Sequence, residues 1–252
     1  MATKGAHGDI RRGVVLAAGF GSRLRGSDDE PIKPLVEVAG QPMIFRALRG
    51  LVQAGCEELV VVVGYRGDEL RRAIAAGPDL GAPVVFVDNP RFDLANGVSL
   101  LSARPRLGAE FVVAMADHVI GDEVMALARA HTPEPGGATL LVDRRVTEIF
   151  DLPDATKVRT DGDRLRDIGK QLTDYDCIDI GVFVCTTGLL DALDAEFAGR
   201  GDASLSQGVA RLAALGKMAT LDIGDGFWQD VDTPEMLAYT AGLLAAAPSP
   251  AR

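Results

Sequence analysis

The stretch Gly13-Val14-Val15-Leu16-Ala17-Ala18-Gly19-Phe20-Gly21-Ser22-Arg23-Leu24 decides the fold of this 252-residue chain. Its first six residues form a short apolar run that ends in glycine, which predicts a buried strand. The glycines that follow allow positive φ and close approach of the backbone to a ligand. Exposed backbone N–H groups in such a loop can hold a polyphosphate.

Two cations lie close to this loop in the sequence: Arg23, and Lys33 of the downstream Lys33-Pro34-Leu35. Phosphoryl oxygens gain charge during displacement, so fixed cations stabilise the transition state more than the ground state. The loop is not a P-loop, which requires Gly-Lys-Ser/Thr, and it lacks the G-x-G-x-x-G fingerprint of dinucleotide-binding proteins.

Short apolar runs alternate with helical patterns through the first part of the chain. This alternation predicts βαβ crossovers and a mostly parallel sheet. The expected strands are 13–18, 59–63, 84–87, 111–116 and 138–142, and the expected helices are 42–54, 67–76 and 122–130.

The pattern changes after Asp143. Strands over 157–160 and 164–168 flank the turn Asp161-Gly162-Asp163, which predicts a β-hairpin. Further strands are expected at 178–184 and 218–223, and helices at 189–197, 205–215 and 234–246, the last with proline in its first turn. We therefore predict one domain over 1–252, with a more antiparallel insertion.

Composition excludes several classes of protein. The chain is 47% hydrophobic and 25% charged, as is ordinary for globular proteins. Its net charge of −10 argues against a nucleic-acid partner. The sequence holds no run of the ~18 apolar residues that a membrane span needs, and its first twelve residues lack the apolar core of a secretory signal. These features predict a cytoplasmic protein that is not inserted in a membrane.

The pattern LAAGxGxRL with a downstream KPL resembles the signature of sugar-phosphate and alcohol-phosphate nucleotidyltransferases. The resemblance implies their α/β fold, a Rossmann-like central sheet with flanking helices and an inserted antiparallel hairpin region. It implies a nucleotide-binding half over about 10–143, an acceptor-binding half over about 144–235, and a closing helix and tail over 236–252. It assigns catalysis to Arg23 and Lys33. The implied nucleotide-binding residues of the loop are Leu16, Ala17, Ala18, Gly19, Gly21 and Ser22.

Two acidic motifs follow in the order that this family shows. Asp117 comes just after the strand expected at 111–116, where the family places a magnesium-binding, nucleotide-contacting aspartate. The segment Trp228-Gln229-Asp230-Val231-Asp232-Thr233-Pro234 resembles the second motif. Alignment on the tryptophan makes Asp230 the Mg²⁺ ligand, whereas alignment on Asp-Thr-Pro makes it Asp232. Both alternatives stay open.

The nucleotide and the acceptor are implied by later segments. The segments Asn89-Pro90 and 96–100 resemble cytidylyltransferases for phosphocholine-like and polyol phosphates, and they imply nucleotide contacts by Asn89, Asn96 and Ser99. The order of motifs between 154 and 181 is similar to inositol-1-phosphate cytidylyltransferases, which make CDP-inositol from CTP and L-myo-inositol 1-phosphate. Asp179-Ile180-Gly181 departs from the Asp-Thr-Gly expected in that family.

Four residues are candidates for binding the acceptor. Lys157 and Lys170 could pair with its phosphate, and Asp154 and Asp179 could accept hydrogen bonds from its hydroxyls. The acceptor phosphate is itself the nucleophile, so no protein nucleophile is required. His118 is expected to have a supporting or packing role.

The resemblance also bears on partners. Prokaryotic members are often fused to a membrane-embedded CDP-alcohol transferase, so a second step here would need a separate membrane partner. A homodimer stays open.

Other functions remain as alternatives. Within the same class, the acceptor could be another cyclitol phosphate, a phosphocholine-like molecule or a phosphonate, with a cytidylyl or guanylyl donor. From another class, a non-catalytic nucleotide sensor is disfavoured by the intact set of charged residues, and an oxidoreductase by the missing dinucleotide fingerprint.

Overall fold

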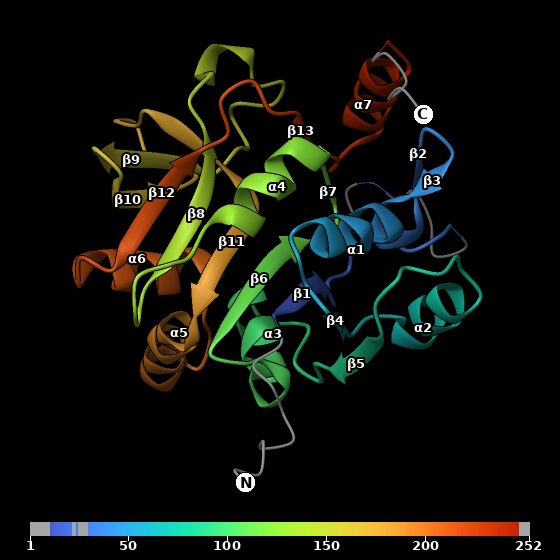
Figure 1. Ribbon diagram of the computed structural model, residues 1–252, viewed down its shortest axis with the longest axis horizontal. Helices are drawn as coiled ribbons and strands as arrows, with labels where there is room; N and C mark the ends of the chain where they lie inside the picture. Colours follow the sequence, from blue (N-terminus) through green and yellow to red (C-terminus); the bar gives the residue numbers. More distant parts are fainter. Residues whose placement is uncertain (1–10, 22–23, 25–29, 247–252) are drawn as a thin grey trace, which may run out of the picture.

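A nine-stranded sheet crosses the whole molecule between two layers of helices (Figure 1). The computed structural model describes residues 11–21, 24 and 30–246. The strand order is β5-β4-β1-β6-β11-β8-β12-β10-β9. The strands are β1 Arg12–Ala17, β4 Glu58–Val63, β5 Val84–Asp88, β6 Glu110–Met115, β8 Ala138–Asp143, β9 Lys157–Asp161, β10 Arg164–Gly169, β11 Cys177–Thr186 and β12 Met218–Asp222.

Helices cover both faces of this sheet. They are α1 Met43–Gln53, α2 Gly67–Ala75, α3 Asn96–Ala103, α4 Asp122–Ala130, α5 Thr187–Arg200, α6 Leu205–Ala214 and α7 Pro234–Ala246. Alternate residues of β1 point to opposite faces: Val14 and Leu16 join the core beneath α3, α5 and α6, while Val15 and Ala17 join the core beneath α1, α2 and α4. The sheet is therefore buried on both sides, as the apolar runs predict.

The two halves of the sheet differ in strand direction. Strands β5, β4, β1 and β6 are all parallel, which confirms the βαβ alternation predicted for the first half. Strand β11 then runs antiparallel to both β6 and β8, and only β8 and β12 are parallel to each other beyond it. The predicted central sheet with flanking helices is confirmed, with a parallel first half and a mixed second half.

The predicted hairpin is confirmed as β9 and β10, which pair antiparallel around Gly162-Asp163, with Gly162 at φ 64°. It lies at the far edge of the sheet, and β9 also pairs with the start of β11. This second pairing links the hairpin back to the middle of the sheet.

Two small sheets were not predicted. One pairs β2 (Glu37–Val38) with β3 (Gln41–Pro42), and the other pairs β7 (His118–Ile120) with β13 (Trp228–Asp230). Their strands are only two or three residues long, too short to show a periodic pattern. The second of them carries His118 and Asp230, and Asp117 and Asp232 lie next to its strands in the chain.

The helix ends follow from local chemistry. Ser204 and Gln207 form a capping box at the start of α6, in which each side chain bonds the other's backbone N–H. Helix α5 begins after Thr186, whose side chain accepts a hydrogen bond from Gly188 N, and ends at Gly201 with φ 71°. Among the described residues, no helix is long and apolar enough to cross a bilayer.

Two glycines of α5 make a matched pair for testing this packing. A Cβ on Gly188 would lie 2.1 Å from the backbone oxygen of Gly136, whereas a Cβ on Gly199 would meet no atom within 4 Å. We expect Gly188→Ala to lower the free energy of unfolding by about 1–3 kcal/mol through overpacking. Gly199→Ala should raise it by up to about 1 kcal/mol through helix propensity. Urea denaturation measures both free energies of unfolding. Equal effects of the two changes would contradict the close contact between Gly188 and the backbone of Gly136.

Candidate active site

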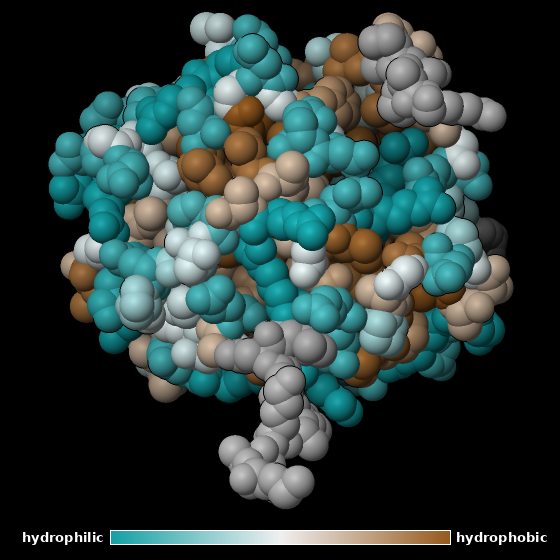
Figure 2. All heavy atoms as spheres, viewed as in Figure 1, coloured by the Kyte–Doolittle hydropathy of each residue, from teal (hydrophilic) through white to brown (hydrophobic). Residues whose placement is uncertain are grey.

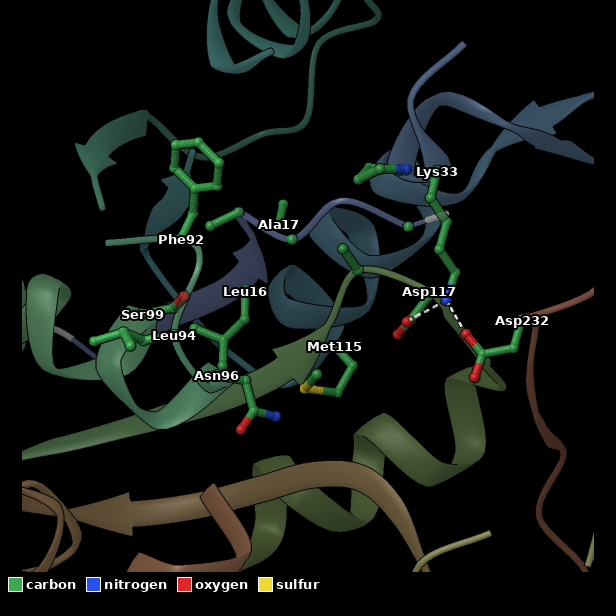
Figure 3. A pocket seen from close by; sticks show the side chains of 15 residues that line it. Leu16, Ala17, Lys33, Phe92, Leu94, Asn96, Ser99, Met115, Asp117 and Asp232 are labelled. Carbon is green, nitrogen blue, oxygen red and sulfur yellow. Dashed lines mark hydrogen bonds and ion pairs between the residues drawn. The ribbon is translucent and has the colours of Figure 1, made fainter. Parts of the chain in front are cut away.

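A cavity of about 310 Å³ opens where the parallel strands end (Figure 3). From β1 the chain proceeds to β4 on one side and reaches β6 on the other, so the cavity lies where the strand order reverses. Its walls are Leu16, Ala17, Ala18, Gly19, Gly21, Lys33, Pro34, Phe92, Leu94, Asn96, Ser99, Met115, Ala116, Asp117 and Asp232.

The glycine loop covers one side of this cavity. Gly21 has φ 60°, and a Cβ there would lie 2.5 Å from the Cβ of Lys33. Glycine is therefore required at this position both for its conformation and for the close approach of the loop to Lys33. Ser22 and Arg23, which the sequence assigns to the same loop, lie outside the described residues.

Lys33 joins two carboxylates at the charged end of the cavity. It opens the 3₁₀ turn Lys33–Leu35 and is 7% exposed. Its Nζ lies 2.5 Å from Oδ2 of Asp117 and also bonds Oδ1 of Asp232 (Figure 3). Burial alone would lower the pKa of Lys33, but the two negative charges outweigh burial and raise it. For Asp117 the directions are reversed: burial alone would raise its pKa. The Lys33 charge and the hydrogen bond and charge of His118 outweigh burial, so the pKa of Asp117 is lowered.

The small β7–β13 sheet brings the two carboxylates together. His118 on β7 is directly opposite Asp230 on β13. Just beyond this pair, the backbone N–H of Val231 donates to the backbone oxygen of Asp117 at 2.9 Å. Asp117 accepts this hydrogen bond, and Asp232 directly follows the residue that donates it. The bond therefore brings together two aspartates that are 115 positions apart in the chain.

Asp230 and Asp232 face different surroundings. Asp232 lines the cavity beside Lys33, whereas Asp230 does not line it and lies close to His118. Burial raises the pKa of Asp230, and the charges of Asp232 and Asp117 raise it further, against the effect of His118. The geometry thus favours Asp232 as the partner of Asp117 in the first cavity. Asp230 lines only the second cavity, which is described next.

A second cavity, of about 260 Å³, adjoins the first. The two share four wall residues: Asn96, Met115, Asp117 and Asp232. Three of the predicted acceptor-binding residues, Asp154, Lys170 and Asp179, line the second cavity, and Lys170 Nζ pairs with Asp154 Oδ1 at 2.8 Å.

Asp179 is held in place by an irregularity in β11. The register of β11 against β8 shifts between Asp179 and Phe183, and Gly181 in that interval has φ 75°. The N–H of Gly181 donates to Oδ1 of Asp179 at 2.7 Å. Burial raises the pKa of Asp179 to about 6, although this hydrogen bond and the His118 charge act in the opposite direction.

The structure places two predicted contact residues, Asn89 and Lys157, outside both cavity walls. Asn89 is 1% exposed, and both ends of its amide are used: it donates to Ser99 Oγ at 2.9 Å and accepts from Arg91 N at 2.9 Å. Lys157 is 6% exposed, and its Nζ donates to the backbone oxygens of Pro153 and Lys170. Neither side chain lines the first or the second cavity, and each bonds a residue that does: Ser99 for Asn89 and Lys170 for Lys157.

Asn96 has a structural task as well as a place on both cavity walls. Its Oδ1 accepts from the N–H of Leu205 at 2.9 Å, which ties α3 to the start of α6. Ser99 lines the first cavity but is 6% exposed.

Sequence reasoning missed several wall residues. These are Phe92, Leu94 and Met115 of the first cavity and Thr156, Ser206 and Trp228 of the second. Apolar residues such as Phe92 carry no signal that separates a ligand wall from a core. Ser206 lies inside the Ser204–Gln207 capping box, so its sequence context indicates a helix start only.

The donor set suits a divalent cation. Asp117 and Asp232 offer carboxylate oxygens that already share one positive group. In the part of the chain that the structure describes, no cluster of three or more His, Cys, Asp or Glu forms a metal site. Two carboxylates suffice for Mg²⁺, because it is usually held by one or two carboxylates together with substrate phosphates and water.

Comparison with known proteins agrees with this geometry. A family model, the MobA-like NTP transferase domain, matches residues 13–213. The chain is 38% identical over 246 residues to the bifunctional IPC transferase and DIPP synthase of Rubrobacter xylanophilus, covering 93% of this chain and 52% of that protein. It spans about half the length of the curated relatives it matches.

Solved structures show the same fold. The inositol-1-phosphate CTP transferase from T. maritima superposes with a TM-score of 0.80 at 27% identity, over 94% of this chain and 96% of that one. A UDP-glucose pyrophosphorylase, at 14% identity, matches with a TM-score of 0.78 over 94% of this chain and 98% of that one. The fold and the site define a nucleotidyltransferase. The chain belongs to the MobA-like NTP transferase family.

The two aspartates of the second motif can be separated by experiment. We expect Asp232→Asn to weaken Mn²⁺ binding by at least about tenfold, because it removes a charged oxygen beside Asp117. Asp230→Asn should change the Mn²⁺ dissociation constant by less than about threefold. Electron paramagnetic resonance of free Mn²⁺ measures both constants. The reverse order of effects would make Asp230 the ligand.

Proposed function

We propose that the protein transfers CMP from CTP to a polyol phosphate, with L-myo-inositol 1-phosphate as the acceptor, and releases pyrophosphate. The observation that carries this proposal is that two cavities meet at Asp117 and Asp232. Such an arrangement suits a reaction that joins two phosphorylated molecules. The names of the relatives, an IPC transferase and an inositol-1-phosphate CTP transferase, supply the choice of CTP and of the acceptor.

The first cavity suits a nucleoside triphosphate. Phe92, Leu94 and Leu16 lie toward one end of it, and Lys33, Asp117 and Asp232 lie at the other (Figure 3). We assign the base and ribose to the apolar end, and the phosphates to the charged end beneath the glycine loop. Residues 10–143 then serve the nucleotide.

The second cavity suits a phosphorylated polyol. Ionised Asp154 and Asp179 accept hydrogen bonds from hydroxyl groups, while Lys170 supplies a positive charge for a phosphate. Residues 144–235 contribute most of this wall. Helix α7 packs through Leu237 and Leu244 on the small core that contains Val119 and Val231.

The reaction is an in-line displacement. A phosphate oxygen of the acceptor attacks the α-phosphorus of CTP, a new P–O bond forms, and the bond from the α-phosphorus to the bridging oxygen breaks. The electron pair of the broken bond leaves with pyrophosphate. Lys33 Nζ stabilises negative charge that develops on the phosphoryl oxygens, and the two cavity walls hold the reacting groups in line.

Asp117 and Asp232 would hold Mg²⁺ at the boundary between the cavities. When bound, the ion would neutralise phosphate charge and orient the phosphates for displacement. Because Lys33 pairs with the same two carboxylates, a bound cation would compete with its Nζ for their oxygens.

Pyrophosphate release tests the function. We expect signal with CTP, Mg²⁺ and inositol 1-phosphate in a grid of four nucleoside triphosphates against four acceptors. The other acceptors are phosphocholine, glucose 1-phosphate and 2-aminoethylphosphonate. Signal with CTP and another acceptor would contradict the acceptor but keep the reaction class. A blank grid from protein that binds nucleotide in calorimetry would favour the non-catalytic sensor.

The titration of Asp179 predicts a pH dependence for the acceptor. Since its pKa is raised to about 6, the carboxylate loses its charge as the pH falls through that value. A polyol then loses a charged hydrogen-bond acceptor, so kcat/KM for the acceptor should fall about tenfold between pH 7 and pH 5.

The matched variant Asp179→Asn removes this titration and keeps the size of the side chain. The acceptor phosphate also titrates near pH 6, and both enzymes share that effect. The ratio of the two kcat/KM values should therefore report Asp179 alone. A ratio that stays constant from pH 5 to pH 8 would contradict the role of Asp179.

A further inference from the structure

The side chain of His118 lies between the Asp117 carboxylate and the Trp228 indole. Its Nδ1 is 2.8 Å from Oδ1 of Asp117. An ionised carboxylate only accepts hydrogen bonds, so Nδ1 carries the proton and donates. The imidazole plane is within 17° of the indole plane of Trp228, with 6.1 Å between the ring centroids.

This hydrogen bond fixes how Asp117 presents its oxygens. His118 takes Oδ1, and Lys33 takes Oδ2. A carboxylate held at one oxygen cannot rotate freely about its terminal torsion, so Oδ2 stays directed at the charged end of the first cavity. That is the oxygen that lies on the same ammonium group as Asp232.

His118 is itself held by its neighbours. The indole N–H of Trp228 donates to Oδ2 of Asp143 at 2.7 Å, and Asp143 is 3% exposed. Arg145 donates to both oxygens of Asp143, at 3.0 and 2.9 Å. The indole is thus anchored at its edge while its face supports the imidazole.

Gly181 lies close to the Cδ2–Nε2 edge of the imidazole. A Cβ on Gly181 would lie 2.9 Å from both Cδ2 and Nε2 of His118. The register shift in β11 that gives Gly181 its φ of 75° therefore also makes room for the ring. The ring is therefore held by the indole and by Gly181 at its Cδ2–Nε2 edge, with its Nδ1 directed at Asp117, and it also lines the second cavity.

We infer that His118, supported by Trp228, Asp143 and Arg145, is a positioning residue that orients Asp117 for a divalent cation. It acts through Asp117 and takes no part in bond making. The inference rests on the metal-dependent reaction proposed above, but not on the identity of the base or of the acceptor.

Two amide substitutions separate positioning from packing. In His118→Asn the amide nitrogen stands near the position of Nδ1 and can still donate to Asp117. In His118→Gln it stands near the position of Nε2 and cannot. We expect His118→Gln to weaken Mn²⁺ binding about tenfold or more, the usual cost of removing such an outer partner. His118→Asn should stay within about threefold of the wild type.

The binding constant is measured by electron paramagnetic resonance with Mn²⁺ alone, and the melting temperature is measured in parallel without metal. Both variants should melt within about 2 °C of each other, which removes general stability as the cause. Equal Mn²⁺ affinities for the two variants would overturn the inference, as would a wild type that does not bind Mn²⁺.

This experiment is independent of the proposed function, because it uses neither CTP nor acceptor. A blank pyrophosphate grid with a tenfold difference between the variants would leave the positioning role standing and the proposed reaction wrong. A positive pyrophosphate grid with equal Mn²⁺ affinities for the two variants would support the proposed reaction and overturn the positioning role.

Discussion

One ammonium group connects the parts of this molecule that have to meet. Lys33 Nζ contacts Asp117 and Asp232, which are 84 and 199 positions away in the chain. Three segments therefore converge on a single charge: the turn after the glycine loop, the end of β6 and the segment after β13. Removing Lys33 would leave the two carboxylates close together without their shared cation in a largely buried place, which is strongly destabilising. The remaining architecture can be understood as the framework that holds these three segments in register.

The framework has two components of very different size. The parallel half of the nine-stranded sheet brings the ends of β1 and β6 to one edge, where the glycine loop and Asp117 emerge. The two-stranded β7–β13 sheet then returns the chain from the second half to that same edge. Apolar residues cover this connection: Val119 and Val231 are both buried in a small core of their own, apart from the two cores of the large sheet. On the surface, apolar side chains also gather beside α7, near the end of the chain (Figure 2).

The large sheet could be predicted from the sequence because its signals are local. Runs such as 59–63 are long enough to show burial on both faces, α4 spans the predicted residues 122–130, and α7 begins at the predicted Pro234. The charged groups could be predicted because phosphate chemistry requires cations and hard oxygens. The choice between Asp230 and Asp232 could not, because it depends on how three-residue strands pair across more than a hundred positions. The buried roles of Asn89 and Lys157 also escaped, since a polar residue that supports a wall has the same sequence signature as one that lines it.

The shared wall of the two cavities has a consequence for how the enzyme would turn over. Asn96, Met115, Asp117 and Asp232 border both spaces, so the proposed nucleotide and acceptor would meet at these four residues. A joined product would extend across both spaces at once, whereas each substrate fills only one. Such a product would exclude both substrates from the free enzyme. Accumulated product would then inhibit the enzyme in competition with each substrate. The rate of product formation would depend on how fast another process removes the product.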